Sequence, residues 1–259
     1  MEPATTLRST LLLILAASAV AQAFVVDVNN GPGTNFTSLA AAIAAAPSGA
    51  VINVRAGVYN EPAFTISATS LTILGMPGVE VVLPANVPLR VEALGPTQQV
   101  VIERMRVRSA VATMLSIECL NNQGVVQLEA LGSFLDPFGL VATDCDWLVA
   151  AECSFVGAGV RSTNSSVVLE QCGVSRVSGI AVVQTGGSVQ LVETTITGFA
   201  TFSGTVPPTY LLQGGDVRIS ADSAVASGSN IMTNQLGPCF SGNGTARVDP
   251  RAILTGAPI

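Results

Sequence analysis

Residues 139–198 read GLVATDCDWLVAAECSFVGAG, then VRSTNSSVVLEQCGVSRVSG, then IAVVQTGGSVQLVETTITG. A short apolar run recurs in each of the three segments, and a second apolar position follows each run. The runs start at Leu148, Val167 and Val189, and the following positions are Phe155, Val174 and Ile196. Self-similarity at such a period is typical of a solenoid, in which each turn packs only on its neighbours. The stretch therefore predicts stacked rungs.

The same pattern continues on both sides of this stretch when it is aligned on a V-x-L core. The aligned cores are Val100–Ile102, Val126–Leu128, Leu148–Ala150, Val167–Leu169, Val189–Leu191 and Val217–Ile219. Because strand side chains alternate, the first and third residues are expected to face inward and the middle one outward. Five positions after the first core residue we expect an inward turn, at least in the middle rungs, at Met105, Leu131, Cys153, Cys172, Thr194 and Asp222.

A second strand is expected before each V-x-L strand. We place it at Met114–Ile117, Leu140–Thr143, Val160–Thr163 and Ile180–Val183, with a weaker example at Tyr210–Leu212. Its outward positions on the expected face are Leu115, Val141, Arg161 and Ala181, then Ile117, Thr143, Thr163 and Val183. That face is largely apolar or small, so it is poorly suited to grip a uronate polymer.

A short helix is expected over residues 37–46, ahead of the first rung. Thr37 or Ser38 can cap its N-terminus, alanine is the best helix former, and Pro47 ends it. Its Leu, Ala and Ile side chains share one face, which is expected to be buried as a lid over the first rung.

The N-terminal order of motifs is GTNFTSL at 33–39, an alanine helix, PSG at 47–49, VINV at 51–54, GVY at 57–59 and SLTILG at 70–75. It resembles the cap and first rungs of pectin-lyase-like right-handed parallel β-helix proteins, a group that includes pectin methylesterases. The resemblance covers about residues 25–75, and the remainder matches as generic rungs. It implies an all-β, single-stranded right-handed parallel β-helix with a short N-terminal α-helical cap.

We expect four segments along the chain: 1–23 a signal peptide, 24–49 the first strand and capping helix, 50–225 the rungs, and 226–259 an irregular last rung or tail. Arg8, the apolar run Leu11–Ala17 and an A-x-A site before Phe24 describe the signal peptide. An uncleaved anchor is the alternative, but the run is shorter than the roughly 20 residues of a membrane span. The expected location is secreted, periplasmic or cell-envelope, with no membrane attachment after cleavage.

The low content of charged residues and the negative net charge limit the kinds of molecule that the protein is expected to bind. Only 11% of the 259 residues are charged, the net charge is −6, there is no Lys or His, and all 11 basic residues are Arg. A chain with no basic run is a poor candidate for nucleic-acid binding, and its acidity disfavours anionic membranes. Polysaccharides or cell-surface components are the expected partners.

The five cysteines are Cys119, Cys145, Cys153, Cys172 and Cys239. Counting from the V-x-L cores predicts two stacks in successive rungs, Cys119 with Cys145 and Cys153 with Cys172. We favour reduced, buried thiols, with one or two disulfides as the alternative. A metal site is disfavoured because His and C-x-x-C are missing. Cys239 is left over as a free thiol or an intermolecular link.

Enzymes of the resembled class, as the resemblance implies, carry an Asp cluster with Arg, Lys or His on one outer sheet face. None of the later pectin methylesterase motifs, a Q-D-T-L-like run, D-F-I-F-G or L-G-R-P-W, occurs in this sequence. Polygalacturonase chemistry usually needs His and lyase chemistry often uses Lys, and both residue types are missing. The resemblance therefore transfers no catalytic residue.

The weak candidates for a catalytic site are Asp144, Asp146 and Arg161, with Glu118 nearby. Asp144 and Asp146 flank Cys145, so both point outward if Cys145 points inward. Such a pair can share a proton or bind Ca²⁺. The competing interpretation, which we favour, is a solvated turn, because Asp favours turns and further calcium ligands are not visible.

A column of acidic residues is a second candidate. Glu103, Glu129 and Glu170 share the fourth position of their rungs, with Ala151 between the last two. Stacked like charges raise a carboxyl pKa unless Arg104 or Arg106 compensates. A solvated outer wall is the favoured interpretation.

We expect an exported β-helix repeat protein without catalytic activity, with a structural or surface and glycan-binding role and no cofactor. The alternative is a diverged carbohydrate-active enzyme, a polysaccharide lyase, hydrolase or esterase that uses Asp144, Asp146 and Arg161, with Ca²⁺ only in that case. A module of a larger adhesin is a third possibility.

Overall fold

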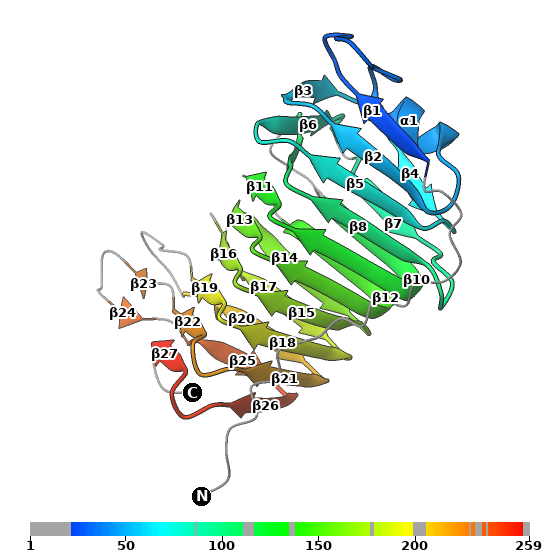
Figure 1. The fold of residues 1–259 in the computed structure, drawn as a ribbon. Helices are drawn as coiled ribbons and strands as arrows, with labels where there is room; N and C mark the ends of the chain where they lie inside the picture. The colour runs from blue at the N-terminus through cyan, green and yellow to red at the C-terminus, as the bar shows by residue number, and fades with distance from the viewer. Residues whose placement is uncertain are drawn as a thin grey trace, which may run out of the picture.

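The structure is a computed structural model that describes residues 22–85, 87–110, 117–134, 138–176, 179–198, 206–227, 229–230, 235–236 and 238–255. The predicted signal peptide, apart from its last two residues, and the predicted strand residues Met114–Ser116 lie outside these ranges. Apart from one short helix, the regular elements of the described chain are β-strands, and they wind into one parallel β-helix, which confirms the expected fold class (Figure 1).

Each rung contributes strands to three faces, numbered here in chain order from the V-x-L strands. Face 1 holds β1 (Ala23–Val26), β2 (Ala50–Val54), β5 (Leu71–Gly75), β8 (Gln99–Glu103), the second parts of β10 (Ile117–Glu129) and β12 (Phe138–Ala151), β15 (Ser166–Glu170), β18 (Ser188–Val192), β21 (Asp216–Ile219) and β26 (Thr245–Val248). All neighbouring strands on this face pair in parallel.

Face 2 follows face 1 along the chain. It holds β3 (Gly57–Asn60), β6 (Val79–Leu83), β9 (Arg106–Ser109), β11 (Gly132–Phe134), β13 (Ser154–Gly157), β16 (Gly173–Arg176), β19 (Thr195–Thr197), β22 (Ala224–Ala226) and β27 (Ile253–Thr255). Face 3 closes each rung. It holds β4 (Thr65–Ser67), β7 (Leu89–Glu92), the first parts of β10 and β12, β14 (Gly159–Thr163), β17 (Val182–Thr185), β20 (Tyr210–Gln213) and β25 (Phe240–Gly242). A short antiparallel pair, β23 (Ser229–Asn230) and β24 (Gln235–Leu236), stands apart.

The V-x-L register predicted from the sequence is confirmed. Val100, Val126, Leu148, Val167, Val189 and Val217 pair in succession, and all are buried. The predicted inward turn is confirmed for Met105, Leu131, Cys153, Cys172 and Thr194. It is wrong for Asp222, which is exposed while Ser223 is buried, because the corner after β21 is one residue longer than the corner after β18.

Single residues in the left-handed conformation make the corners of the rungs. Between faces 1 and 2 these are Arg104, Ala130, Glu152, Gln171 and Glu193, with φ between 48° and 54°. Between faces 3 and 1 they are Ala68, Ala93, Asn121, Asp144 and Asn164, with φ between 48° and 56°. One such residue turns the chain without a loop, so the rungs stay in register across both corners.

The cysteines form one of the two predicted stacks. Cys153 and Cys172 come directly before the paired residues Ser154 and Gly173, which confirms that stack. The stack of Cys119 with Cys145 is wrong, because Cys119 pairs with Ala142 and Cys145 with Asn122. The prediction counted residues from the V-x-L core of one rung to the next cysteine. It failed because this stretch includes a connection whose length differs from rung to rung. All five cysteines are free and buried.

Buried polar side chains line the inside of both corners. Ser165 Oγ donates to the Thr163 carbonyl at 2.8 Å and Thr194 Oγ1 to the Val192 carbonyl at 3.0 Å. The thiols of Cys145 and Cys172 donate in the same way to the carbonyls two residues earlier, at 3.4 and 3.3 Å. The cysteines therefore occupy hydroxyl positions in a structural ladder, and burial raises the pKa of the Cys145 thiol.

Helix α1 (Leu39–Ala45) lies at the N-terminal end of the stack, as Figure 1 shows, and buries Leu39, Ala42 and Ile43. Ser38 is its N-cap residue, and Glu61 reaches the same end from the first rung. The Glu61 carboxylate accepts the Leu39 N–H at 2.6 Å and the Ala40 N–H at 3.1 Å. Since these donors have no partner inside the helix, Glu61 fastens the cap to the rungs.

Replacing Glu61 by alanine is expected to lower the free energy of unfolding by about 1–3 kcal/mol, because two helix-end N–H groups lose a charged acceptor. Urea unfolding followed by far-UV circular dichroism measures this loss. The exposed Glu170 is the control position, and Glu170→Ala is expected to change stability by less than about 0.5 kcal/mol. Equal effects at the two positions would contradict the capping role of Glu61.

Asp27 closes the turn that follows β1. Its carboxylate accepts the backbone N–H groups of Asn29 and Gly31 and pairs with Arg55 NH1 at 2.9 Å. The Asn29 N–H, followed by the Arg55 guanidinium, holds the pKa of Asp27 below its usual value. The charged carboxylate is therefore the form that the fold favours.

The contribution of Asp27 to the free energy of unfolding is expected to be fully present above the pKa of the unfolded chain, about 3.9. It is expected to be lost as the pH falls through the lower pKa of the folded chain. An Asp27→Asn variant removes this titration. Its difference in unfolding free energy from the parent chain should therefore shrink as pH drops from 6 toward 2. A difference that stays constant over this range would show that Asp27 does not titrate with folding.

Residues 238–255 add a further rung, since β25, β26 and β27 pair in parallel with β20, β21 and β22. Among the described residues no helix has the length and apolar character needed to cross a membrane.

Candidate functional site

The sequence-predicted cluster on face 3 is spread over three rungs. Glu118 pairs with Val141, and Val141 pairs with Arg161, so Val141 separates the two charges. Glu118 instead accepts two hydrogen bonds from the previous rung, at 2.9 Å from Arg90 Nε and 2.7 Å from Arg90 NH2. The acid therefore has a structural partner on its own face.

Asp144 and Asp146 are both exposed, with Cys145 buried between them. Asp144 is the left-handed corner residue, at φ 52°, and lies three positions beyond Val141. It is therefore at the edge of face 3, while Arg161 stands on the strand itself. None of the four predicted residues lines the three grooves described below.

Two predicted outward positions on face 3 are wrong. Ile117 is fully buried and Ala181 is 1% exposed. Arg161 pairs with Val183, so β17 starts two residues later than predicted, after a connection of different length. Leu115 lies outside the described residues. The outward column is Arg90, Glu118, Val141, Arg161, Val183 and Leu211.

The predicted acidic column on face 1 is confirmed by the register. Glu103 pairs with Glu129, which pairs with Ala151, which pairs with Glu170. Arg104 NH2 lies 3.5 Å from the Glu103 carboxylate, and Gln127 donates to Glu129 at 3.5 Å. Neighbouring side chains thus engage the two adjacent acids. In the described ranges no group of three or more metal-ligating side chains comes together.

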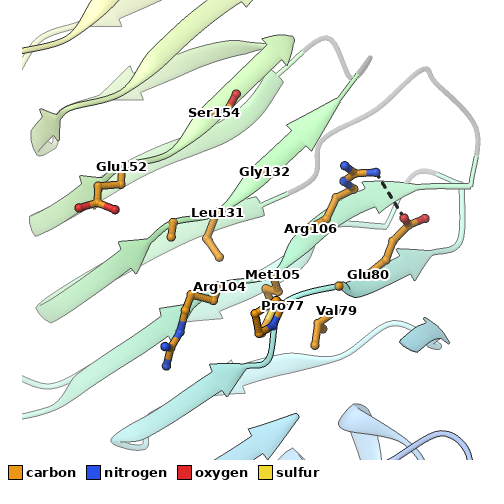
Figure 2. Close-up of a pocket in the computed structure, with 12 residues that line it drawn as sticks. Pro77, Val79, Glu80, Arg104, Met105, Arg106, Leu131, Gly132, Glu152 and Ser154 are labelled. Carbon is orange, nitrogen blue, oxygen red and sulfur yellow. Dashed lines mark ion pairs between the residues drawn. The ribbon is translucent and has the colours of Figure 1, made fainter. Parts of the chain in front are cut away.

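One groove, of about 550 Å³, runs along the corner between faces 1 and 2. Figure 2 shows Glu80 reaching Arg106, with Arg104 and Glu152 directed elsewhere along the wall. Glu80 lies 3.6 Å from Arg106 NH1 and accepts from Arg108 Nε at 2.7 Å. Glu80 pairs with Arg106 of the next rung, and no aromatic residue lines the groove, so we assign it a structural role.

A second groove, of about 460 Å³, separates α1 from β4. Its wall consists of small and apolar side chains of the cap and the first face-3 strand, and it contains no charged residue. It marks the joint between the cap and the rungs.

A third groove lies on the outer surface of face 1, with a volume of about 210 Å³, and is named here the Trp147 groove. It is lined by Trp147, Ser166, Val167, Val168, Ser188, Val189, Gln190, Asp216 and Arg218. Trp147 is 51% exposed although its neighbour Leu148 is fully buried. Strand alternation explains this, because Leu148 belongs to the core column and Trp147 must then point outward.

Two outward columns form the floor beside the indole. In the three following rungs, the residues that align with Trp147 are Ser166, Ser188 and Asp216. The adjacent column holds Val168, Gln190 and Arg218. Ser188 Oγ donates to Ser166 Oγ at 3.3 Å, and Arg218 makes no ion pair with any described residue. The result is a flat surface with an aromatic ring at one end and polar groups repeating about every 4.8 Å.

Sequence reasoning missed Trp147. The signal was present, because the sole tryptophan of the chain directly precedes a core strand whose alternation places it outside. Tryptophan is enriched at binding interfaces, so the half-exposed indole marks a candidate contact site.

No protein-family model matches the chain, and no curated protein matches its sequence. Among solved structures, a pectin methylesterase mutant crystallised in complex with a hexasaccharide is similar. It shares 12% sequence identity with the chain at a TM-score of 0.40, over 92% of this chain and 93% of that one.

Proposed function

We propose that the protein binds glycans through the Trp147 groove on face 1. The observation that carries the proposal is the half-exposed indole at the end of a flat sheet whose next three rungs present polar side chains. A partner of this kind agrees with the surface or glycan-binding role expected from the sequence.

Aromatic stacking supports a sugar ligand. The face of an indole carries partial negative charge, which attracts the weakly positive C–H groups on one face of a pyranose ring. Stacking also removes apolar area of both partners from water. A tryptophan side chain has only two side-chain torsions, so it loses little conformational entropy on binding.

The polar groups of the groove suit hydroxyl recognition. Ser166, Ser188 and Gln190 each can donate and accept, Asp216 accepts, and Arg218 donates. Both signs of charge are present, so the groove does not depend on an acidic ligand. A few convergent polar groups beside an apolar surface are the usual composition of a small-molecule site.

Export is part of the same proposal. The Leu11–Ala17 run and the A-x-A site before Phe24 direct the chain to the cell envelope or beyond, where polysaccharides are found. Intact mass of the exported protein should show a mature chain that starts at Phe24. A chain that keeps residues 1–23 would contradict cleavage.

A binding and turnover screen tests the function. Purified protein is mixed with insoluble or immobilised neutral and uronate polysaccharides, with and without Ca²⁺, and both depletion from solution and product release are measured. We expect at least one polysaccharide to retain the parent chain and not Trp147→Ala, without turnover. Failure of all polysaccharides to retain the chain would refute the proposal, and turnover lost in Asp144→Ala would replace it by the enzyme alternative.

A further inference from the structure

The last rung has hydrogen-bonding groups that face away from the stack. The Thr245 N–H at the start of β26 donates to the Gly215 carbonyl, and the Asp249 N–H directly after β26 donates to the Ile219 carbonyl, both at 2.9 Å. Because the backbone groups of a strand alternate in direction, those of Ala246 and Val248 point to the free edge. The Ile253 N–H donates to Ser223 at 3.0 Å, so the groups of Leu254 in β27 face the same way.

Core side chains are also uncovered at this end. Val248 continues the column of Ile219, which is 3% exposed, yet Val248 is 37% exposed. Leu254 continues the column of Val225, which is fully buried, yet Leu254 is 44% exposed. Among the described residues no strand or helix lies over them. Within the described part of the chain, the C-terminal rung thus presents an open edge and an open core, which proteins normally cover.

The opposite end is closed. The outer edge of β1 is covered by residues 35–36, through the Asn35 N–H to the Val25 carbonyl at 2.8 Å and the Asp27 N–H to the Phe36 carbonyl at 2.9 Å. The Asn35 side chain accepts the Val25 N–H at 2.8 Å, and α1 lies over the core. A second copy therefore cannot add its N-terminal end to the open rung as a further turn.

We propose that the open end of residues 240–255 binds the same end of a second copy, around a two-fold axis perpendicular to the stack. An occupant must offer strand edges with free N–H and C=O groups and an apolar centre, and the C-terminal end of another copy offers both. A two-fold axis that is perpendicular to both the stack and β26 makes the two facing β26 strands antiparallel, which allows main-chain hydrogen bonds, and it closes the assembly at two copies.

The charges of the rim are compatible with self-association. Asp249 and Arg251 pair with each other at 3.2 Å within one chain, and Arg247 lies between the two edge-facing residues Ala246 and Val248. Both signs are therefore present on the surface that would meet its own copy. Like charges alone would oppose an interface of this kind.

Proline at position 246 gives a selective test. It removes an N–H that points to the free edge and places a ring there, and it removes no hydrogen bond within the chain. The control Ala246→Val keeps the N–H. Light scattering coupled to size exclusion should give twice the chain mass for the parent and for Ala246→Val, and the single-chain mass for Ala246→Pro.

A second variant, Leu254→Lys, places a charge on the exposed core position and leaves the backbone unchanged. Leu254→Lys is expected to give the single-chain mass as well. If Ala246→Pro does not fold, the mass of Leu254→Lys alone tests the proposal. A parent chain of single-chain mass over a wide range of concentration would overturn the proposal. In that case, slow hydrogen exchange of the Ala246 and Val248 N–H groups, which face the free edge, would assign the edge to a segment of the same chain. A dimer that survives both substitutions would equally overturn it.

Discussion

Replacing Asn122 by leucine is expected to lower the free energy of unfolding by about 2–5 kcal/mol. Asn122 is fully buried at the corner between faces 3 and 1. Its Oδ1 accepts the Leu94 N–H at 3.1 Å and its Nδ2 donates to the Val91 carbonyl at 3.0 Å. Leucine has a similar volume but can neither accept the Leu94 N–H nor donate to the Val91 carbonyl, so both backbone groups of the previous rung lose a hydrogen-bond partner in the interior.

The neighbouring Asn121 provides the matched control. It is exposed and holds the left-handed corner conformation, with φ 51°. Glycine adopts that conformation freely, so Asn121→Gly should change the unfolding free energy by less than about 1 kcal/mol. Chemical denaturation of both variants measures the difference. Equal losses would mean that the corner conformation, rather than the buried amide, sets the stability.

Replacing Trp147 by alanine is expected to weaken glycan binding by about 2–3 kcal/mol, or roughly 30- to 150-fold in dissociation constant. The reason is the loss of the stacking surface at the end of the Trp147 groove. Calorimetric titration with the best ligand of the screen measures it without relying on fluorescence. Trp147→Phe should recover part of the affinity because it restores an aromatic face.

Val156 is the matched control for Trp147, since it is 46% exposed on face 2, away from the groove. Val156→Ala should leave the dissociation constant unchanged, and both variants should unfold at the same denaturant concentration as the parent within error. A Trp147→Ala protein that unfolds early would indicate a packing role for the indole. An affinity unchanged in Trp147→Ala would show that the ligand binds elsewhere.

The fold could be predicted because its determinants are local and repeated. The V-x-L cores and the fifth-position inward turn recur within short corners of nearly constant length, so counting along the chain keeps the register. The capping helix is similarly local, since Ser38 and the Leu39, Ala42 and Ile43 face are contiguous in sequence. The contribution of Glu61 was not predictable, because it acts across 22 residues on Leu39.

The register of the face-3 strands was harder to predict from the sequence because connections of unequal length precede these strands. The stack of Cys119 with Cys145 and the outward positions of Ile117 and Ala181 failed for this reason. The candidate cluster of Asp144, Asp146, Arg161 and Glu118 depends on the same face. Val141 and Arg161 pair as predicted, but Val141 lies between Glu118 and Arg161, and Arg90 pairs with the acid.

The Trp147 groove could have been found from face 1, where the register is reliable. Carboxylates and cations predict acid–base or metal chemistry, whereas the signal on this face is an aromatic residue that strand alternation places outside. Ser166, Ser188 and Asp216 share its column by the same V-x-L alignment. The polar and aromatic content of this surface was therefore readable from the sequence.

Tryptophan fluorescence tests glycan binding most directly, because Trp147 is the sole tryptophan in the chain. Titration of the parent protein with soluble oligosaccharides of the retained polysaccharide should shift the emission maximum to shorter wavelength and saturate. The change should give the same dissociation constant as calorimetry. Binding seen by calorimetry with no change in Trp147 emission would contradict the groove as the binding site.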